Sequence, residues 1–159
     1  MIDFTKVVSI TSIHGYDEED TRLLNKMCHD AHDYLSLQPL VGEIKNSHYG
    51  LGTGGVVAVF LMEIEALGES IDPYLWVIVG DLPPAFLSAH GVSNPARALS
   101  AYMDSMQKWV DAVRMGHSVD NLISVNIEPT KENAELLAQR LEFIDSEVLF
   151  EYVADLEIQ

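Results

Sequence analysis

Two strongly apolar segments separated by a short turn constrain the fold of this chain more than any other feature. The first spans residues 56–65 and the second spans residues 74–79. Both are rich in β-branched and aromatic side chains, which favour strands. The connection at residues 68–73 is too short to contain the crossover helix that parallel strands require. The two segments are therefore predicted to pair as an antiparallel hairpin.

The first apolar segment has apolar side chains on both faces at its start and becomes polar on one face at Glu63 and Glu65. This pattern indicates an inner strand whose end reaches solvent. Alternating apolar and polar residues predict a further short strand at residues 123–127. Residues 6–13 are rich in β-branched side chains, so they are predicted to form either a strand or the lead-in to the first helix.

Three segments have the residue spacing of amphipathic helices. An acidic stretch at residues 17–20 begins the first helix, where carboxylates suit the positive end of the helix dipole. Asn94 caps the second helix, with Pro95 at its first position and Gly116 beyond its end. Thr130 caps the third. The positions predicted to be buried are Leu24, Met27, Cys28, Ala31 and Leu35, then Leu99, Met103, Met106, Val110 and Val113, then Leu137, Leu141, Ile144 and Val148.

The order of these elements predicts an α+β fold, in which three helices pack on a small, mostly antiparallel sheet as a two-layer sandwich. An α/β fold with a parallel sheet is the alternative. The sequence contains no internal repeat and no linker long enough to divide it, so residues 1–159 are predicted to form a single domain.

The charge balance is strongly acidic, with 9 basic and 25 acidic residues and a formal net charge of −16. Such a surface repels phosphate backbones and anionic lipid, so binding to nucleic acid or to a membrane is not expected. Two interpretations stay open. The charge serves solubility alone, or it meets a basic protein partner, in one version by mimicking nucleic acid to block a protein that binds it.

The cysteine content and the first residues bear on location. Cys28 is the only cysteine and has no internal disulfide partner, which fits a reducing compartment. Residues 1–4 lack the basic and apolar regions of a signal peptide, and the longest apolar run, residues 56–62, is too short to cross a bilayer. A cytoplasmic location is therefore predicted, with no cofactor expected.

A glycine-rich segment at residues 50–55 has the spacing of the glycine loops that bind dinucleotides or cover ATP in kinases. A dinucleotide loop leads from a strand into a helix, whereas these glycines lead into a strand. The kinase motifs that would have to follow are missing. A glycine-rich turn is the simpler interpretation, although the backbone N–H groups of Gly52 and Gly54 remain candidates for binding an anion.

Two histidines on the first helix form a candidate metal site. His29 and His32 lie on the same side of a helix, and imidazole suits zinc or a similar ion. Cys28 lies on the apolar stripe and is expected to point away from them. Completing the site would require further ligands such as His14 or His48. The alternative is a polar helix face beside a core cysteine.

Three more residues are candidates for a site. Asp81 follows a buried strand, where a carboxylate either does chemistry or bonds to turn amides. Together with His48, Gly52 and Gly54 it makes up the predicted ligand-binding set. Tyr102 and Trp109 lie at the edge of the apolar stripe of the second helix. They are predicted to contact a second subunit or a partner, with core packing as the alternative.

Four segments resemble a small bacterial family of uncharacterised proteins, a domain of unknown function. These segments are residues 57–60, 76–86, 98–113 and 125–130, and the most distinctive piece is Gly-Asp-Leu-Pro-Pro at residues 80–84. The likeness covers roughly the second two-thirds of the chain. The resemblance implies a bacterial cytoplasmic origin, and it carries no catalytic residues because no activity is known for that family.

Three functional hypotheses follow from the sequence. The first is a non-enzymatic interaction protein with an acidic surface, such as an immunity or inhibitor protein that neutralises a basic toxin or nuclease. The second is an enzyme or a binder of a small ligand or metal that uses the glycine-rich segment, the histidines and Asp81. It requires these residues to converge on one cavity. The third is a homodimer that buries an apolar helix edge.

Overall fold

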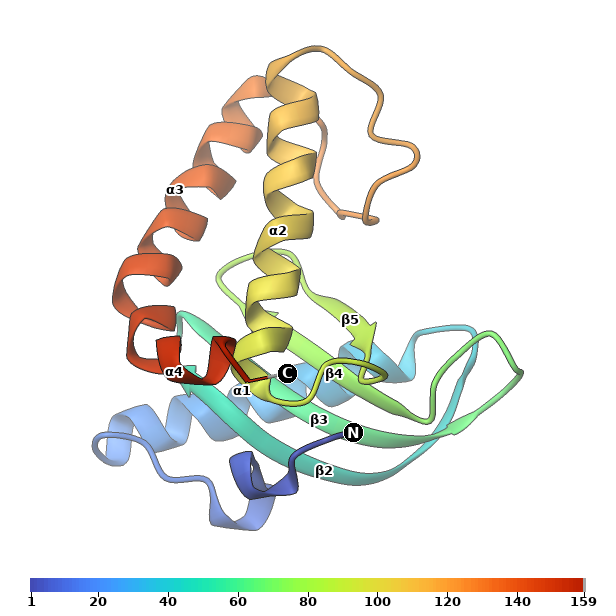
Figure 1. Cartoon of the computed structure of the whole chain (residues 1–159), viewed down its shortest axis with the longest axis vertical. Helices are drawn as coiled ribbons and strands as arrows, with labels where there is room; N and C mark the ends of the chain where they lie inside the picture. Colours follow the sequence, from blue (N-terminus) through green and yellow to red (C-terminus); the bar gives the residue numbers. More distant parts are fainter. Residues whose placement is uncertain (159) are drawn as a thin grey trace.

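The predicted hairpin forms the centre of the fold in the computed structural model, which describes residues 1–158 (Figure 1). Strand β3 (Val57–Ala66) pairs antiparallel with β4 (Tyr74–Gly80), with Phe60 opposite Val77. Side chains of both strands are almost entirely buried, as the apolar pattern on both faces predicted. The hairpin prediction is confirmed.

A five-stranded antiparallel sheet is completed by β1 (Val8–Ser9), β2 (Val41–Thr53) and β5 (Ala85–Ser88). The strands pair in sequence order from β1 to β5, so the sheet is a simple meander. The short strand β1 pairs with β2 only at Tyr49 and His48. Most of the outer edge of β2 therefore lies beyond the reach of β1.

The three predicted helices are present, and the second and third have their predicted caps. The side chains of Asp17, Asn94 and Thr130 each accept a hydrogen bond from the backbone N–H three residues further along. Gly116 follows the second helix with φ of +71°, which glycine adopts most readily. The helices are α1 (Glu18–Ser36), α2 (Pro95–Arg114), α3 (Lys131–Glu147) and the short α4 (Val153–Leu156), with 3₁₀ turns η1 (Phe4–Lys6), η2 (Ile10–Ser12) and η3 (Leu149–Tyr152).

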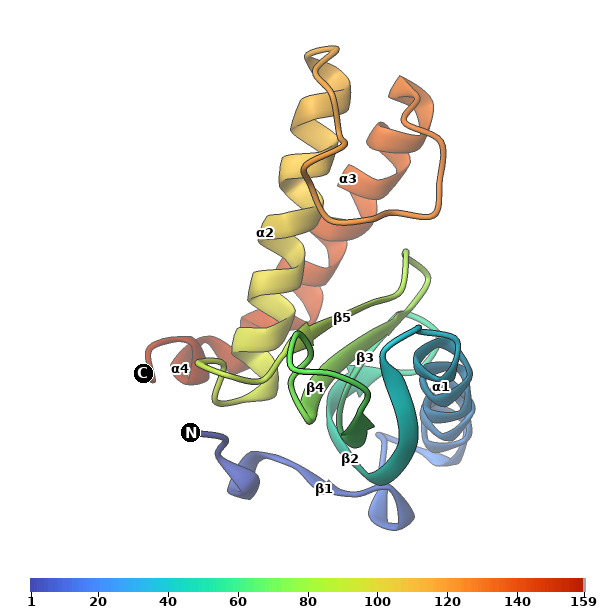
Figure 2. The same cartoon turned by 90° about the vertical axis from the view of Figure 1, so that its right-hand side faces the viewer.

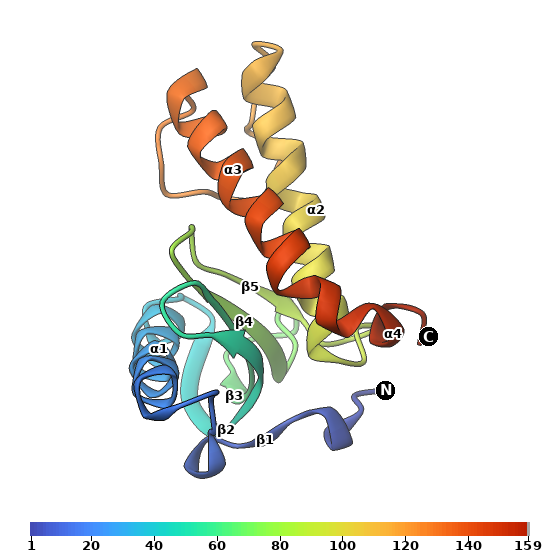
Figure 3. The same ribbon diagram turned by 90° about the vertical axis from the view of Figure 1, so that its left-hand side faces the viewer.

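Helices cover both faces of the sheet, so the expected two-layer arrangement differs from the structure. Figure 2 and Figure 3 show α1 on one side of the sheet and the pair α2 and α3 on the other. Phe60 and Met62 of β3 pack with α1, whereas Val59 and Leu61 pack with the cluster of α2 and α3. The reason is that β3 and β4 are apolar on both faces, and one layer of helices leaves one of these faces in water.

The upper half of the α2–α3 pair extends beyond the sheet, and residues 115–130 return alongside it (Figure 1). The strand predicted at residues 123–127 is wrong, because this segment is irregular and pairs with no strand. Its alternating residues instead place Ile123 and Val125 against α2 and α3. Within residues 1–158, no helix combines the length and apolarity needed to cross a membrane.

Candidate functional site

The glycines predicted to form a binding loop serve close packing. Gly50 and Gly52 lie within β2, and only the turn after Thr53 leaves the strand. A Cβ atom on Gly50 would lie 2.5 Å from the Cβ of Pro95, and one on Gly52 would lie 2.6 Å from the carbonyl oxygen of Val57. Close packing against α2 and β3 therefore explains why glycine occupies these two positions, and no ligand is needed to explain it.

The backbone amide of Gly54 is already occupied. Its N–H donates to Oδ1 of Asp20 at 2.7 Å, across the gap between the β2–β3 turn and the start of α1. The predicted use of this amide to bind an anion is therefore wrong, because a carboxylate of the chain itself takes that place. A ligand anion there would also face the negative charge of Asp20.

The two candidate metal ligands are placed differently from each other. Nε2 of His32 is 2.8 Å from Oγ of Ser47 on β2, while His29 is exposed. Burial lowers the pKa of His32, with a smaller effect of His29 in the same direction. Cys28 is buried in the core as expected, and burial raises the pKa of its thiol. Residues 1–158 contain no group of three or more His, Cys, Asp or Glu side chains that could hold a metal ion.

The remaining members of the predicted ligand-binding set lie far apart in the fold. His48 lies opposite Leu61, its ring is 5.9 Å from that of Phe4, and its buried Nδ1 has no hydrogen-bond partner within the described chain. Asp81 follows β4 and forms an ion pair with Arg140 of α3, with 3.1 Å between Oδ2 and Nε. The structure therefore does not bring the residues of the enzyme hypothesis to one cavity.

Tyr102 and Trp109 are core residues, and the prediction that they lie free at the edge of α2 is wrong. Their exposed fractions are 1% and 2%. The hydroxyl of Tyr102 donates to the carbonyl oxygen of Pro83 at 2.6 Å, which satisfies the polar end of the buried ring. Both rings fill the space between α2, the sheet and α3, so they are unavailable to a partner.

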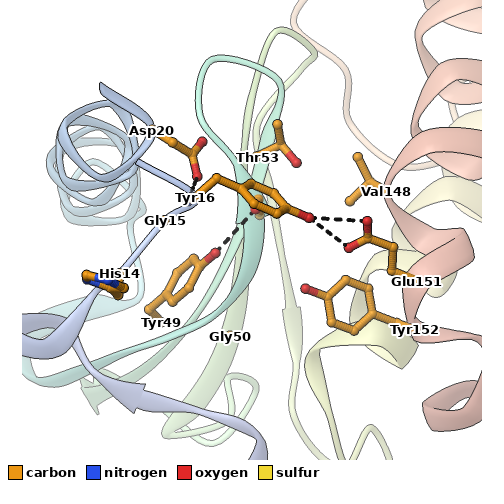
Figure 4. Close-up of a pocket in the computed structure, with 11 residues that line it drawn as sticks. His14, Gly15, Tyr16, Asp20, Tyr49, Gly50, Thr53, Val148, Glu151 and Tyr152 are labelled. Carbon is orange, nitrogen blue, oxygen red and sulfur yellow. Dashed lines mark hydrogen bonds between the residues drawn. The ribbon is translucent and has the colours of Figure 1, made fainter. Parts of the chain in front are cut away.

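A cavity of about 250 Å³ lies between the start of α1, the end of β2 and η3 (Figure 4). We call it the tyrosine pocket, because Tyr16, Tyr49 and Tyr152 line it from three separate segments. The other lining residues are His14, Gly15, Asp20, Gly50, Gly52, Thr53, Val148 and Glu151. In Figure 4 the hydroxyl of Tyr152 points toward the space between the rings, from the side opposite Tyr49.

Asp20 holds one side of the tyrosine pocket together. Its Oδ2 accepts the backbone N–H of Tyr16 at 2.9 Å, while its Oδ1 accepts that of Gly54. One carboxylate thus fixes both the segment before α1 and the turn after β2. A Cβ atom on Gly15 would overlap the Asp20 carboxyl group, so glycine permits this close approach.

The other side of the tyrosine pocket is positioned by the end of the chain. Val148 and Leu149 are buried in the core and anchor η3. The side-chain amide of Asn94 donates to the backbone oxygen of Asp155 at 3.0 Å, and Nζ of Lys6 is 2.9 Å from the carboxylate of Asp155. These contacts bind the segment that carries Glu151 and Tyr152 to the rest of the fold.

The three phenols of the tyrosine pocket are suited to hydrogen bonding rather than to proton transfer near neutral pH. The hydroxyl of Tyr16 donates to Glu151 at 3.2 and 3.3 Å, and this hydrogen bond raises the pKa of Tyr16. Burial raises the pKa of Tyr49 and of Tyr152. All three phenols are therefore neutral near pH 7, and they lie beside the carboxylates of Asp20 and Glu151.

An apolar groove runs between α3 and the turns at the ends of β2 and β4. Two adjoining cavities of about 360 and 330 Å³ share Asp81, Leu136 and Arg140. The Asp81–Arg140 ion pair lies in the part that the two cavities share. Leu136 is 44% exposed and Phe143 is 51% exposed, so the groove presents apolar side chains to solvent. We call it the α3 groove.

Sequence reasoning missed the tyrosine pocket as a whole. Tyr16 and Tyr49 are 33 positions apart, and Tyr152 lies more than 100 positions beyond Tyr49. No motif joins them, because the pocket is made by tertiary packing of three segments. The one available signal was the acidic stretch at residues 17–20, which contributes Asp20.

Comparison with protein-family models, with curated proteins and with solved structures finds no match to this chain. The resemblance to a small bacterial family therefore stays a prediction. Charge and geometry within the described residues are the basis on which a function can be proposed.

Proposed function

We propose that the chain is a non-enzymatic interaction module that binds a basic protein partner through its acidic surface, as an immunity or inhibitor protein does. The observation that carries this proposal is the uncompensated negative charge. Of the 25 acidic residues, six form ion pairs with lysine or arginine within residues 1–158. Most carboxylates thus lack a basic partner in the folded chain, and their summed field attracts a basic protein.

The placement of the predicted site residues favours this proposal over the enzyme alternative. Gly52 lines the tyrosine pocket, Asp81 lines the α3 groove, and His32 is bonded to Ser47 on β2. The tyrosine pocket offers neutral phenols beside carboxylates, which are groups that hold a ligand by hydrogen bonds and charge.

Self-association is the second candidate form of the interaction, and the α3 groove favours it. Leu136 and Phe143 are seven positions apart on α3, so they lie on the same side of the helix and are both exposed. A second copy would bury them in a symmetric contact. Light scattering at micromolar concentration tests this form, since a dimeric mass supports a homodimer and a monomeric mass removes it.

The proposal places the protein in the cytoplasm of a bacterium, in line with the resemblance drawn from its sequence. The single cysteine supports a reducing compartment, because Cys28 is buried and has no disulfide partner within the described chain. A tagged chain expressed in its own organism should therefore fractionate with cytoplasmic markers, and recovery with the membrane or the medium would contradict the location.

The proposed function is tested by capture followed by reconstitution. The tagged chain is used at low salt to capture partners from the lysate of its own organism, and each candidate is then purified and titrated by calorimetry. We expect one protein with a high isoelectric point that binds with a fixed stoichiometry. Failure of every purified candidate to bind, or a partner that is itself acidic, would contradict the proposal.

A further inference from the structure

We infer that the tyrosine pocket binds a cationic side chain, lysine or arginine, of the basic partner. This inference rests on the proposed function and names the place where the partner is anchored. The pocket combines aromatic rings and carboxylates around a space of about 250 Å³, which suits one long side chain. Ammonium and guanidinium groups bind both to the faces of tyrosine rings and to carboxylates.

The charge of the pocket lining favours a cation. Asp20 and Glu151 lie on opposite sides of the space, and His14 is the one basic side chain among the lining residues. The carboxylate oxygens of Asp20 each accept one backbone N–H, which leaves each of them a second lone pair. Glu151 is exposed and forms no ion pair with lysine or arginine within residues 1–158.

The hydrogen bond between Tyr16 and Glu151 is weak enough for a ligand to displace it. Its distances of 3.2 and 3.3 Å are long for an O–H···O hydrogen bond, whose usual range is about 2.5–3.0 Å. The Tyr16 side chain is 79% exposed, so little packing holds it in place. A cation that takes the Glu151 carboxylate would release the hydroxyl and keep the ring of Tyr16 beside the charge.

Exposed apolar residues next to the lining residues in the sequence favour a cation that belongs to a protein. Phe150 is 71% exposed and Val153 is 49% exposed, and both flank the lining residues Glu151 and Tyr152 in the sequence. A free amine would leave these apolar side chains in water, whereas a partner would cover them. Aromatic residues such as Phe150 are enriched in protein–protein interfaces relative to the rest of the surface.

A short peptide tests the inference on the intact chain. The probe is N-acetyl-Leu-Arg-Leu-amide, with its citrulline counterpart as the neutral control and the lysine and norleucine peptides as a second pair. We expect the arginine and lysine peptides to shift the amide NMR signals of Gly15, Tyr16 and Tyr152. The citrulline and norleucine peptides should not do so. Equal binding of charged and neutral peptides, or shifts elsewhere in the chain, would overturn the inference.

Variants distinguish the contribution of the negative charge to binding from the contribution of the aromatic rings. Glu151→Gln should weaken binding of the arginine peptide about tenfold, because it removes a charge-assisted contact. Tyr16→Ala should weaken it about fivefold, whereas Tyr16→Phe keeps the ring and should retain the affinity. Glu69→Gln is the matched control, since it removes the same charge from the exposed β3–β4 turn. Thermal unfolding of each variant verifies that the fold is intact.

Two further comparisons identify the source of the cation and keep the two proposals distinguishable. Butylguanidinium should bind more weakly than the arginine peptide, and equal affinity would overturn the assignment to a partner side chain. The captured partner is then titrated with Glu151→Gln and with Tyr16→Ala. A partner that binds both variants as tightly as the wild type would overturn this inference and leave the proposed function standing.

Discussion

Single side chains fix the geometry of the tyrosine pocket, and Asp20 does most of this. It accepts two backbone N–H groups, from Tyr16 and Gly54, that belong to segments on either side of α1 in the sequence. Hydrogen bonds to an ionised carboxylate are among the stronger ones in proteins. The pocket therefore depends on a residue that a sequence reading assigns only to the start of a helix.

Asp20→Ala should lower the free energy of unfolding by about 1–3 kcal/mol, because two N–H groups lose a charged acceptor. Urea unfolding measures the change. Asp104→Ala is the matched control, since Asp104 is exposed on α2 and forms no hydrogen bond or ion pair through its side chain within the described chain. Equal stability of the two variants would mean that the Asp20 contacts contribute nothing.

Burial of His32 is expected to make the folded protein less stable as the pH falls below neutrality. Burial lowers the pKa of His32 in the folded protein below its ordinary value of 6.5. The unfolded chain therefore binds the proton more readily than the folded protein does. The stability that neutral His32 contributes is present above about pH 6.5, and it is lost as the pH falls toward the pKa of His32 in the folded protein. In urea titrations from pH 7.5 to 5.5, His32→Gln should lose less stability than the wild type. A loss of stability in His32→Gln as large as that of the wild type would contradict this account.

The elements differ in how far the sequence determines them. Helix α2 was predicted with its cap and its end, because Asn94, Pro95 and Gly116 act within a few residues of where they stand. Strand β2 was missed, because bulges interrupt its pairing with β3 and break the alternation of its side chains. The position of α1 on the second face, and the tyrosine pocket beside it, depend on contacts between distant segments that no local pattern encodes.

The end of β4 shows how close packing constrains an element. Gly80 has φ of +150°, and a Cβ atom there would lie 2.2 Å from the carbonyl oxygen of Val56. Gly68 has a similar φ of +144° but no atom within 4 Å of such a Cβ. Gly68→Ala should therefore lower the free energy of unfolding by about 1–3 kcal/mol, because of backbone strain alone. Gly80→Ala should lower the free energy of unfolding distinctly more, as measured by chemical denaturation. Equal losses in the two variants would show that β4 moves away from Val56 without an energetic penalty.

The whole molecule carries a net charge of −16, which affects its own stability as well as its partners. Like charges repel across a compact surface, and salt weakens this repulsion. Raising sodium chloride from about 10 to about 100 mM shortens the screening length from about 30 to about 10 Å. We expect stability to rise by about 1 kcal/mol, seen as an increase of several degrees in Tm. A Tm that falls with added salt would mean that attractive ion pairs outweigh the repulsion.

The rate at which the chain associates with its captured partner tests the central claim most directly. Attraction between an acidic surface and a basic partner speeds the encounter, and salt screens it. Stopped-flow measurements at about 50 and about 300 mM salt should show an association rate constant that falls about tenfold or more, with a smaller change in the dissociation rate. An association rate constant that is the same at both salt concentrations would contradict the claim that the acidic surface recruits the partner.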